Sequence, residues 1–332
     1  MCDQAAGPAD TIMAQRSPLV SVVVPCFNHA RYLGEALSSL AAQTHQAWEC
    51  LIVDDGSTDE TRRVARRFVD RDPRYRYLHH AHLGQAASRN RALAAARGEL
   101  IQFIDADDAI LPEKIQRQVE ALGRGNGLQV AHCDYFHGRA DSIMEPDREL
   151  RMSPLFIYRK PMYDLALRWE TELSIPIHCF LFDARIFRDH GVRFDETLPN
   201  HEDWDCWMHV FALEPKSIYL DSVLTVYRAS RSVSRDSHIN YAGFLSALSK
   251  QQRIWRDDPI MSRLLDLMAK RINHSYRHVT SRQGLVSDLT KRLGESYRRV
   301  VPWPVQQVVT RFGEARRNPS ASLLRRIGRV SP

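Results

Sequence analysis

The stretch Leu19-Val20-Ser21-Val22-Val23-Val24, ended by Pro25, decides the fold of this chain. Its residues are almost all apolar and β-branched, and they lack the regular polar alternation of a half-exposed strand. Such a run is typical of a strand that is buried on both faces of a parallel sheet. The sequence therefore predicts a buried strand here, with the polar loop Cys26-Phe27-Asn28 at its carboxyl end.

Predicted strands and helices alternate at short intervals after this first strand. Strands are predicted at 50–53, 75–78, 100–104 and 128–133, and helices at 31–43, 57–69, 85–97 and after Pro112. This alternation indicates an α/β fold with a mainly parallel sheet and helices on both faces. Ligands bind at the carboxyl ends of the strands in such folds. Three polar loops are expected to share that rim, at 25–28, 54–57 and 105–108.

Two sequence signals are expected to set helix ends. Ser57 and Glu60 have the spacing of a capping box and predict a helix that begins near Ser57. Gly98 follows the alanine-rich segment 85–97 and is expected to end that helix.

The pattern is less regular beyond residue 135. Residues 141–176 contain several prolines and are expected to form a lid or an acceptor-side segment. Strands are predicted at 177–182, 216–220 and 224–228. From about residue 240 the chain is predicted to be helical, with one apolar face formed by Met261, Leu264, Leu265, Met268 and Ile272.

The charge is distributed unevenly along the 332 residues. The net charge is +6, but residues 240–332 contain 18 Lys and Arg against 6 Asp and Glu, and the remainder contains 28 against 34. Arginine pairs in this tail are interleaved with apolar residues, which suits contact with an anionic membrane surface. The pattern equally suits helices that pack on the body with a solvated arginine face. Nucleic-acid binding is not expected, because no recognised module accompanies the charge.

Cysteine usage and the chain's first residues bear on the compartment. The six cysteines include no C-x-x-C pair and no zinc-ligand spacing, which favours reduced thiols in a cytosolic protein. Residues 1–17 lack an apolar centre and are interpreted as a flexible leader, not a secretory signal. No apolar run approaches the ~18 residues of a membrane span. We expect a cytoplasmic protein, either free or peripheral on the inner face of the membrane.

The acidic run Asp105-Ala106-Asp107-Asp108 is the first candidate for chemistry. Three carboxylates in four residues repel one another unless a cation or hydrogen bonds compensate them. Hard divalent cations prefer such oxygen ligands and readily bridge to phosphates. Taken alone, the run fits a solvated turn before a helix at least as well.

Three further segments carry candidate residues. Asp54-Asp55-Gly56-Ser57 offers carboxylates to a nucleobase or ribose, or is an ordinary strand-to-helix turn. Gly84 before a helix, with Arg89 one turn inside, suits a diphosphate, although Arg89 also fits a surface position. In His201-Glu202-Asp203-Trp204-Asp205 the tryptophan can shield a carboxylate and raise its pKa, or simply fix an acidic helix start to the core.

Together these segments resemble the family-2 glycosyltransferases, which are inverting enzymes with the GT-A fold. The resemblance extends from about Pro18 to Ser234, roughly two thirds of the chain. It rests on five motifs in the family's order: Ser21-Val22-Val23-Val24-Pro25-Cys26-Phe27-Asn28, Ile52-Val53-Asp54-Asp55-Gly56-Ser57-Thr58-Asp59, Ala87-Ser88-Arg89-Asn90, Gly98-Glu99-Leu100-Ile101-Gln102-Phe103-Ile104-Asp105-Ala106-Asp107-Asp108, and Glu202-Asp203-Trp204.

The resemblance implies roles on the donor side. Pro25 and Asp55 match positions that contact the nucleotide base and ribose, and Arg89 matches one near the base and phosphates. Asp105 and Asp107 match the D-x-D carboxylates that bind Mn²⁺ or Mg²⁺. Asp107 is expected to be the direct metal ligand, with Asp105 as its partner on the donor.

It also implies roles around the acceptor. Asp203 matches the general base that takes the proton from the acceptor hydroxyl. Asp54, Asn28, Asp108 and Glu202 are expected to support these groups.

The implied reaction moves one sugar from a nucleotide-diphosphate sugar, with a UDP-sugar favoured, to a hydroxyl of a glycan or lipid-linked acceptor. Cell-envelope polysaccharide biosynthesis is the expected setting. The Gln-x-x-Arg-Trp motif of processive synthases is absent from the sequence, which favours single addition. Many relatives have a His after the last core strand. Here Tyr227-Arg228 follows, so Arg228 or His238 would have to complete the metal shell.

Two alternatives stay open. A nucleotidyltransferase can share a similar sheet, but the loop that starts at Pro25 lacks the glycine-rich pattern of those enzymes. A catalytically degenerate nucleotide-sugar binder is disfavoured by the intact Asp105, Asp107 and Asp203.

We accordingly expect three parts. The leader covers 1–17, and a GT-A domain covers 18–238, with a nucleotide-binding half at about 18–135 and an acceptor half at about 136–238. A helical basic C-terminal extension covers 239–332.

Overall fold

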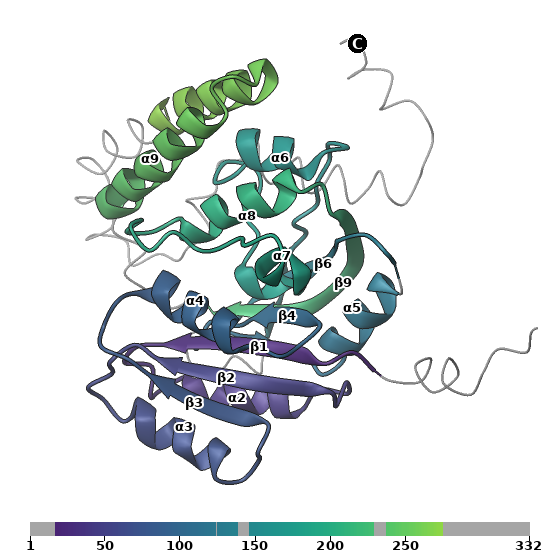
Figure 1. The fold of residues 1–332 in the computed structure, drawn as a ribbon, viewed down its shortest axis with the longest axis vertical. Coiled ribbons are helices and arrows are strands. Elements are labelled where there is room, and N and C mark those ends of the chain that lie inside the picture. The colour runs from purple at the N-terminus through teal and green to yellow at the C-terminus, as the bar shows by residue number, and fades with distance from the viewer. Residues whose placement is uncertain (1–16, 124, 139–145, 229–236, 275–332) are drawn as a thin grey trace, which may run out of the picture. The chain divides into compact units, whose positions relative to one another are not determined.

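The computed structural model describes residues 17–123, 125–138, 146–228 and 237–274 (Figure 1). The expected leader up to residue 16 lies outside these residues. So does the tail beyond residue 274, with its pattern of arginine pairs and apolar residues. The division into three parts remains a prediction.

Strand β1 (Val20–Cys26) is the buried strand that the sequence predicts, and all seven of its residues are buried. It pairs in parallel with β2 (Trp48–Asp54) on one side and with β4 (Leu100–Phe103) on the other. β3 (Tyr75–His79) adds to β2, again in parallel. The first four strands therefore form a parallel sheet in the order β3-β2-β1-β4.

Helices cover both faces of this sheet, because successive residues of a strand point to opposite sides. The valines at positions 20, 22 and 24 pack in one cluster with residues of α2 (Leu33–Ala41), α3 (Thr61–Val69) and α5 (Lys114–Leu122). Val23 packs in the other cluster with residues of α4 (Gln85–Ala95). The predicted α/β architecture is confirmed.

Beyond β4 the sheet continues with strands of mixed direction. β8 (Phe180–Asp183) is antiparallel to β4, and β6 (Gln129–Gly138) is antiparallel to β8 and parallel to β9 (Lys216–Arg228). β5 (Ala109–Ile110) and β7 (Pro146–Met152) are antiparallel additions to β9 and β6.

Two strand predictions in this half need correction. The strands expected at 216–220 and 224–228 are one continuous strand, because register shifts opposite residues 133–135 absorb the residues between them. Of the strand expected at 177–182, Ile177–Cys179 form the 3-10 turn η1, and β8 begins only at Phe180.

The helix-end predictions also need correction. The helix expected from Ser57 begins at Thr61, because the Ser57 hydroxyl accepts a hydrogen bond from the Asn28 N–H at 2.9 Å and is not a cap. Gly98 lies beyond the end of α4 at Ala95, where it passes β1 closely. A Cβ at Gly98 would lie 2.5 Å from the Ser21 nitrogen.

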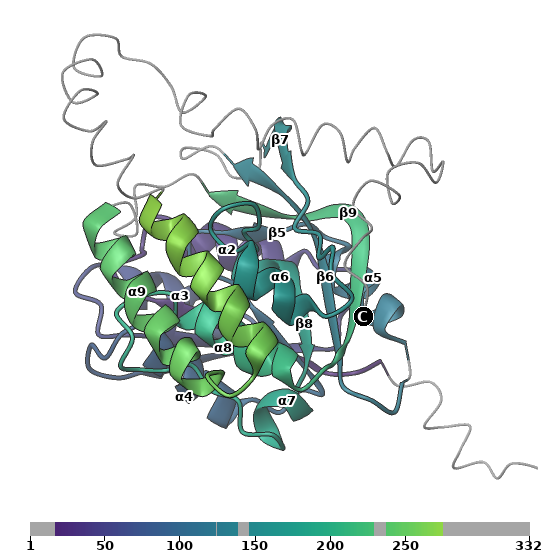
Figure 2. The ribbon, with the colours of Figure 1, turned by 90° about the horizontal axis from the view of Figure 1, so that it is seen from above.

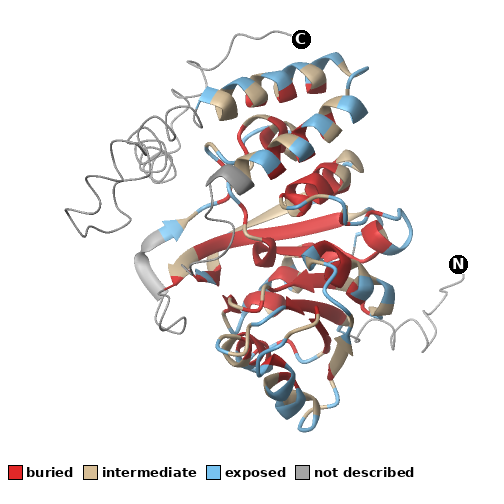
Figure 3. Ribbon diagram, turned by 90° about the vertical axis from the view of Figure 1, so that its left-hand side faces the viewer, coloured by how far each residue is buried: buried red, intermediate tan, exposed pale blue. Residues whose placement is uncertain are grey.

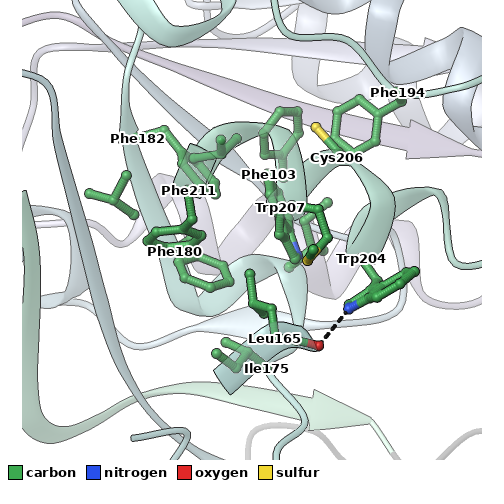
Figure 4. Close-up of a cluster of buried hydrophobic side chains, with 14 of the residues drawn as sticks. Phe103, Leu165, Ile175, Phe180, Phe182, Phe194, Trp204, Cys206, Trp207 and Phe211 are labelled. Carbon is green, nitrogen blue, oxygen red and sulfur yellow. Dashed lines mark hydrogen bonds between the residues drawn. The ribbon is translucent and has the colours of Figure 1, made fainter. Parts of the chain in front are cut away.

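The larger hydrophobic cluster fixes helix α8 (Glu202–Ala212) to the sheet, whose strands are mostly buried (Figure 3). Trp207 stacks on Phe182 of β8 with ring centroids 4.7 Å apart (Figure 4). Trp204 donates from Nε1 to the carbonyl of Leu165 in α6 (Pro161–Leu167) at 3.0 Å. α8 carries the expected base Asp203, so this packing sets the base's position.

Helix α9 (Ser237–Ile254) packs against α8, and the helical residues from 259 onward lie beside α9 (Figure 2). Asp205 of α8 is fully buried and accepts hydrogen bonds from Lys250 Nζ and Gln251 Nε2, both at 2.7 Å. The apolar face expected from the spacing is confirmed, since Met261 and Leu265 are fully buried. No helix in the described ranges is long and apolar enough to cross a membrane.

Candidate active site

The three polar loops meet on one rim, as the parallel register requires. Cys26 lies opposite Asp54 at the ends of β1 and β2, and the Asp55 N–H donates to the Cys26 carbonyl at 2.9 Å. β4 ends beside them at Phe103, two residues before Asp105. Pro25 is buried near the end of β1, opposite Val53.

The side chains of Asp54 and Asn28 stabilise the first two loops through hydrogen bonds. The buried carboxylate of Asp54 accepts from the Ser57 N–H at 2.8 Å and from the Tyr77 hydroxyl at 2.5 Å. Asn28 has a left-handed backbone (φ 53°), and its side-chain oxygen accepts from the Thr58 N–H at 2.8 Å. Both side chains hold backbone in place, in keeping with supporting roles.

Asp55 holds the segment at Leu83 and Gly84 against the rim. Its carboxylate accepts from the backbone N–H groups of Leu83 and Gly84 at 2.7 and 2.9 Å, and it is 3% exposed. His80 and His82 approach the same carboxylate with their Nδ1 atoms at 3.3 and 2.8 Å. Asp55 therefore fixes the segment that leads into α4.

An exposed aromatic pair flanks Asp55, and the sequence motifs did not single it out. Phe27 and His82 stack with ring centroids 4.0 Å apart and an interplanar angle of 24°. Phe27 is exposed, although it follows a buried strand and is a large apolar residue. That position, an aromatic residue two places after Pro25 and directly after the strand, is the signal that could have identified it.

Arg89 joins the turn at residues 105–108, called the acidic turn below, to helix α8. Its guanidinium is buried and donates from Nη2 to Asp105 Oδ1 at 2.9 Å and from Nη1 to Glu202 Oε1 at 2.6 Å. Gln85 adds a third donor to this group, at 3.0 Å from Asp105 Oδ1. Burial opposes the charge on Arg89, but the two carboxylates outweigh it and raise the pKa of the guanidinium. Arg89 thus lies between two carboxylates, one on the turn after β4 and one at the start of α8.

Asp203 lies next to this pair at the start of α8. Burial, and then the like charge of Glu202, raise its pKa to about 7, while Arg89 limits the rise. One carboxylate oxygen accepts from the Trp204 N–H at 2.7 Å, which fixes the side chain. His201 precedes the pair in a left-handed conformation (φ 58°) and turns the chain into the helix. A carboxylate with a pKa near 7 is suited to take a proton at neutral pH.

Asn90, beside Arg89 on α4, pins the segment that leads to α8. Its amide exchanges hydrogen bonds with the backbone of Phe194, donating to the carbonyl at 2.8 Å and accepting from the N–H at 3.0 Å. The same amide donates to Glu196 at 2.8 Å. Helix α4 therefore holds both the acidic turn and the approach to the base.

The end of β9 meets the acidic turn. The Arg228 N–H donates to Asp108 Oδ1 at 2.8 Å, and its Nε donates to the Asp107 carbonyl at 2.7 Å. Asp108 is buried, and its other oxygen lies 2.9 Å from His178 Nδ1. Burial raises the pKa of Asp108 to about 6, and His178 limits the rise. Asp108 is thus an internal strut of the turn, in keeping with its expected supporting role.

The expectation that Arg228 could complete a metal shell is wrong. A guanidinium has only donors and no acceptor for a cation, and this one is turned toward Asp107 and Glu35. The side chain of His238, the other candidate, lies outside what the structure describes.

Asp105 and Asp107 fit a cation whose coordination shell is completed by phosphate oxygens. Both are half-buried on a turn that directly follows β4. In the described ranges no three His, Cys, Asp or Glu side chains could hold a metal by themselves. Mg²⁺-type sites commonly use one or two carboxylates and take the remaining ligands from substrate phosphates and water. The donor set therefore fits an ion that arrives with a diphosphate, although the resident site remains a prediction.

Solved structures place the fold in a known class. The chain matches S. aureus TarS 1–349 in complex with UDP-GlcNAc with a TM-score of 0.58 and 20% identity, over 80% of this chain and 75% of that one. It matches the mannosyltransferase PcManGT of Pyrobaculum calidifontis, in complex with GDP-Man and Mn²⁺, with the same TM-score and 17% identity, over 92% and 82%. The fold is that of the GT-A glycosyltransferases.

The sequence comparison then gives the family. The profile of glycosyl transferase family 2 matches residues 21–191, and the chain belongs to that family. An uncharacterised glycosyltransferase of Rickettsia felis is 29% identical over 255 residues, which are 73% of this chain and 40% of that protein. The chain thus spans about two fifths of that relative's length. Membership of this family, which the sequence motifs implied, is confirmed.

Proposed function

We propose that this glycosyltransferase moves a single sugar from a nucleotide-diphosphate sugar to an acceptor hydroxyl, with inversion and with Asp203 as general base. The observation that carries the proposal is the bridge of Arg89 between Asp105 and Glu202. It brings the acidic turn of the donor side within two hydrogen bonds of the helix that carries Asp203. Family membership favours transfer over the nucleotidyltransferase alternative.

The electrostatics of Asp203 support its role as base. Its pKa is raised to about 7 by burial and by Glu202, so the carboxylate is partly protonated at neutral pH and accepts a proton readily. In a single displacement the acceptor oxygen attacks the anomeric carbon from the face opposite the leaving diphosphate. Such a step needs one carboxylate near that carbon, and Asp203 would supply it.

The donor side is proposed to bind the nucleotide and its diphosphate. Phe27 and His82 offer an exposed stacked surface for the base, beside the loop that Asp55 and Pro25 shape. Asp105 and Asp107 would hold Mn²⁺ or Mg²⁺, which offsets the charge that develops on the leaving phosphate. Arg89 already satisfies two carboxylates, so we assign it the task of holding Asp105 and Glu202 in place and not direct phosphate binding.

The finer identity of the substrates remains part of the proposal. A UDP-sugar is favoured as donor, and a glycan or lipid-linked acceptor of the cell envelope as the second substrate. Among structures of the same fold, one contains UDP-GlcNAc and another GDP-Man with Mn²⁺, so both nucleotides belong in any screen. Action in the cytoplasm, either free or at the inner face of the membrane, is proposed with it.

Replacement of Asp203 by Asn tests the proposal. We expect transfer to fall by about 10²–10⁴-fold, the usual contribution of a positioned general base, while donor affinity changes little. Donor turnover in the presence of a mixed glycan acceptor pool, and titration of the same donor, give the two quantities. Asp195→Asn is the matched control, because Asp195 is a carboxylate near α8 that pairs with Lys250. Full turnover by the Asp203→Asn protein would remove the assignment of the base.

A further inference from the structure

Arg228 occupies an unusual place for an arginine, since its side chain is 1% exposed at the end of β9. Its guanidinium donates from Nε to the Asp107 carbonyl at 2.7 Å and from Nη2 to Glu35 Oε2 at 2.5 Å. It also lies over the ring of Tyr32, 4.5 Å from the centroid. Its own N–H donates to Asp108. One residue therefore holds the acidic turn by both backbone and side chain.

These contacts join three segments that are far apart in sequence. Tyr32 and Glu35 lie at the start of α2. Asp107 and Asp108 lie on the turn after β4, and Arg228 is the last residue of β9. The turn is thus held between a helix start and a strand end. A charge-assisted pair at one end and a carbonyl at the other fix the guanidinium plane, as Arg favours.

The contacts act on the backbone of Asp107 and on the side chain that follows it. The carbonyl of Asp107 is held by Arg228 Nε, while the neighbouring carboxylate of Asp108 is held by the Arg228 N–H and approached by His178. Because the Asp107 carbonyl and the Asp108 carboxylate are both held, the backbone at Asp107 has little conformational freedom. The direction of its Cα–Cβ bond is set accordingly, which restricts where the carboxylate can lie.

We propose that Arg228 is a positioning residue that fixes Asp107 for the cation of the nucleotide-sugar donor, and that Asp108 is the anchor through which it acts. This inference rests on the proposed function, because it assumes that Asp107 binds that cation. Groups that orient a metal ligand from outside the coordination shell commonly change metal affinity by about 10–100-fold when removed. Arg228 is the group that the contacts assign to this task.

The experiment measures the affinity of Mn²⁺ in the presence of UDP or GDP, and separately the affinity of each nucleotide without metal. The variants are Arg228→Gln, Arg228→Lys and Glu35→Gln. The matched control is Arg168→Gln, since buried Arg168 also donates to carboxylates, those of Asp164 and Glu172, and to one carbonyl, that of Leu155, away from the rim. Melting temperatures of all proteins report the structural cost.

We expect Arg228→Gln to weaken Mn²⁺ binding at least tenfold and to leave metal-free nucleotide binding within about twofold of wild type. Arg228→Lys should be intermediate, because one ammonium cannot serve the carbonyl and Glu35 in the same plane. Glu35→Gln, which keeps the backbone contacts, should give a smaller loss in the same direction. Arg168→Gln should lower the melting temperature without changing Mn²⁺ affinity.

The inference is overturned if Arg228→Gln is folded and binds Mn²⁺ as wild type does, or if Arg168→Gln weakens Mn²⁺ binding equally. If Arg228→Gln does not fold, an unchanged Mn²⁺ affinity in Glu35→Gln and Arg228→Lys overturns it instead. Absence of any Mn²⁺-dependent nucleotide binding by the wild-type protein would overturn the metal part of the proposed function itself. The two failures are therefore seen in different proteins.

Discussion

Arg89 shows most clearly how single residues of this chain serve both substrates. The family resemblance implies a place near the donor base and phosphates, which stays a prediction, and the structure places its buried guanidinium between Asp105 and Glu202. Two carboxylates that approach one buried region repel each other unless a cation lies between them. The arginine supplies that charge permanently, so the donor turn and the base helix can be close before any substrate binds.

The pH dependence of transfer follows from the environment of Asp203. Its pKa is raised to about 7, and a base works only when it is deprotonated, so kcat/KM should fall as the pH drops below about 7. In Glu202→Gln the like charge is gone, so the pKa of Asp203 should fall and the acid limb should move to lower pH. Initial rates between pH 5 and 9 locate the acid limb in the wild-type protein and in Glu202→Gln. An acid limb that stays in place in Glu202→Gln would contradict the assigned cause.

At this scale the sequence predicts residue types better than partners. Asp54, Asp55, Asp105 and Asp203 were all expected at the rim or on α8, because strand ends and helix starts can be located from local patterns. The pairing of Arg89 with Glu202 joins residues 113 positions apart. No local pattern encodes such a contact, since it depends on how the two halves of the sheet curl together.

Helix α4 and the strand after it show what the elements contribute. Residues of α4 hold the acidic turn through Arg89 and the approach to α8 through Asn90. Immediately after it, Gly98 passes β1 so closely that a Cβ would lie 2.5 Å from the Ser21 nitrogen and 2.8 Å from the Leu19 carbonyl. The absent side chain is what allows β4 to pair beside β1.

Gly98→Ala should therefore destabilise the protein by about 1–3 kcal/mol, because backbone atoms and not a flexible side chain would have to move. Gly127→Ala is the control, since a Cβ there meets nothing within 4 Å. Urea unfolding of both variants gives the comparison, and the control should stay within about 0.5 kcal/mol of wild type. Equal stability of the two variants would show that the junction can relax.

Element boundaries were predicted less well than element types. Periodicity located the first four strands and the helices between them, but β9 was predicted as two strands. The residues between them look like a turn, and they are carried in the sheet only because bulges opposite 133–135 change the register. Ser57 was likewise expected to be a helix cap and instead binds Asn28, a partner on another loop.

Ligand binding by the whole protein can be followed through its stability. A ligand that binds only the folded state stabilises it by about 2.7 kcal/mol at one hundred times its Kd. We expect the melting temperature to rise with a UDP- or GDP-sugar and to rise further with Mn²⁺. In Asp107→Ala the Mn²⁺-dependent part should be lost and the metal-independent part retained. An undiminished Mn²⁺ effect in that variant would remove Asp107 as the ligand.

The attachment of α9 to α8 has a practical consequence for recombinant fragments. Asp205, two residues after the proposed base, is fully buried and depends on Lys250 and Gln251 for its hydrogen bonds. A fragment that stopped at residue 238 would remove both partners of this carboxylate and would uncover Trp204, against which Phe244 of α9 packs. We expect a fragment of residues 17–238 to express poorly or aggregate, and one of 17–274 to purify as a folded protein. Fragments for crystallisation and for donor screening should therefore extend through the helix that follows α9, to residue 274.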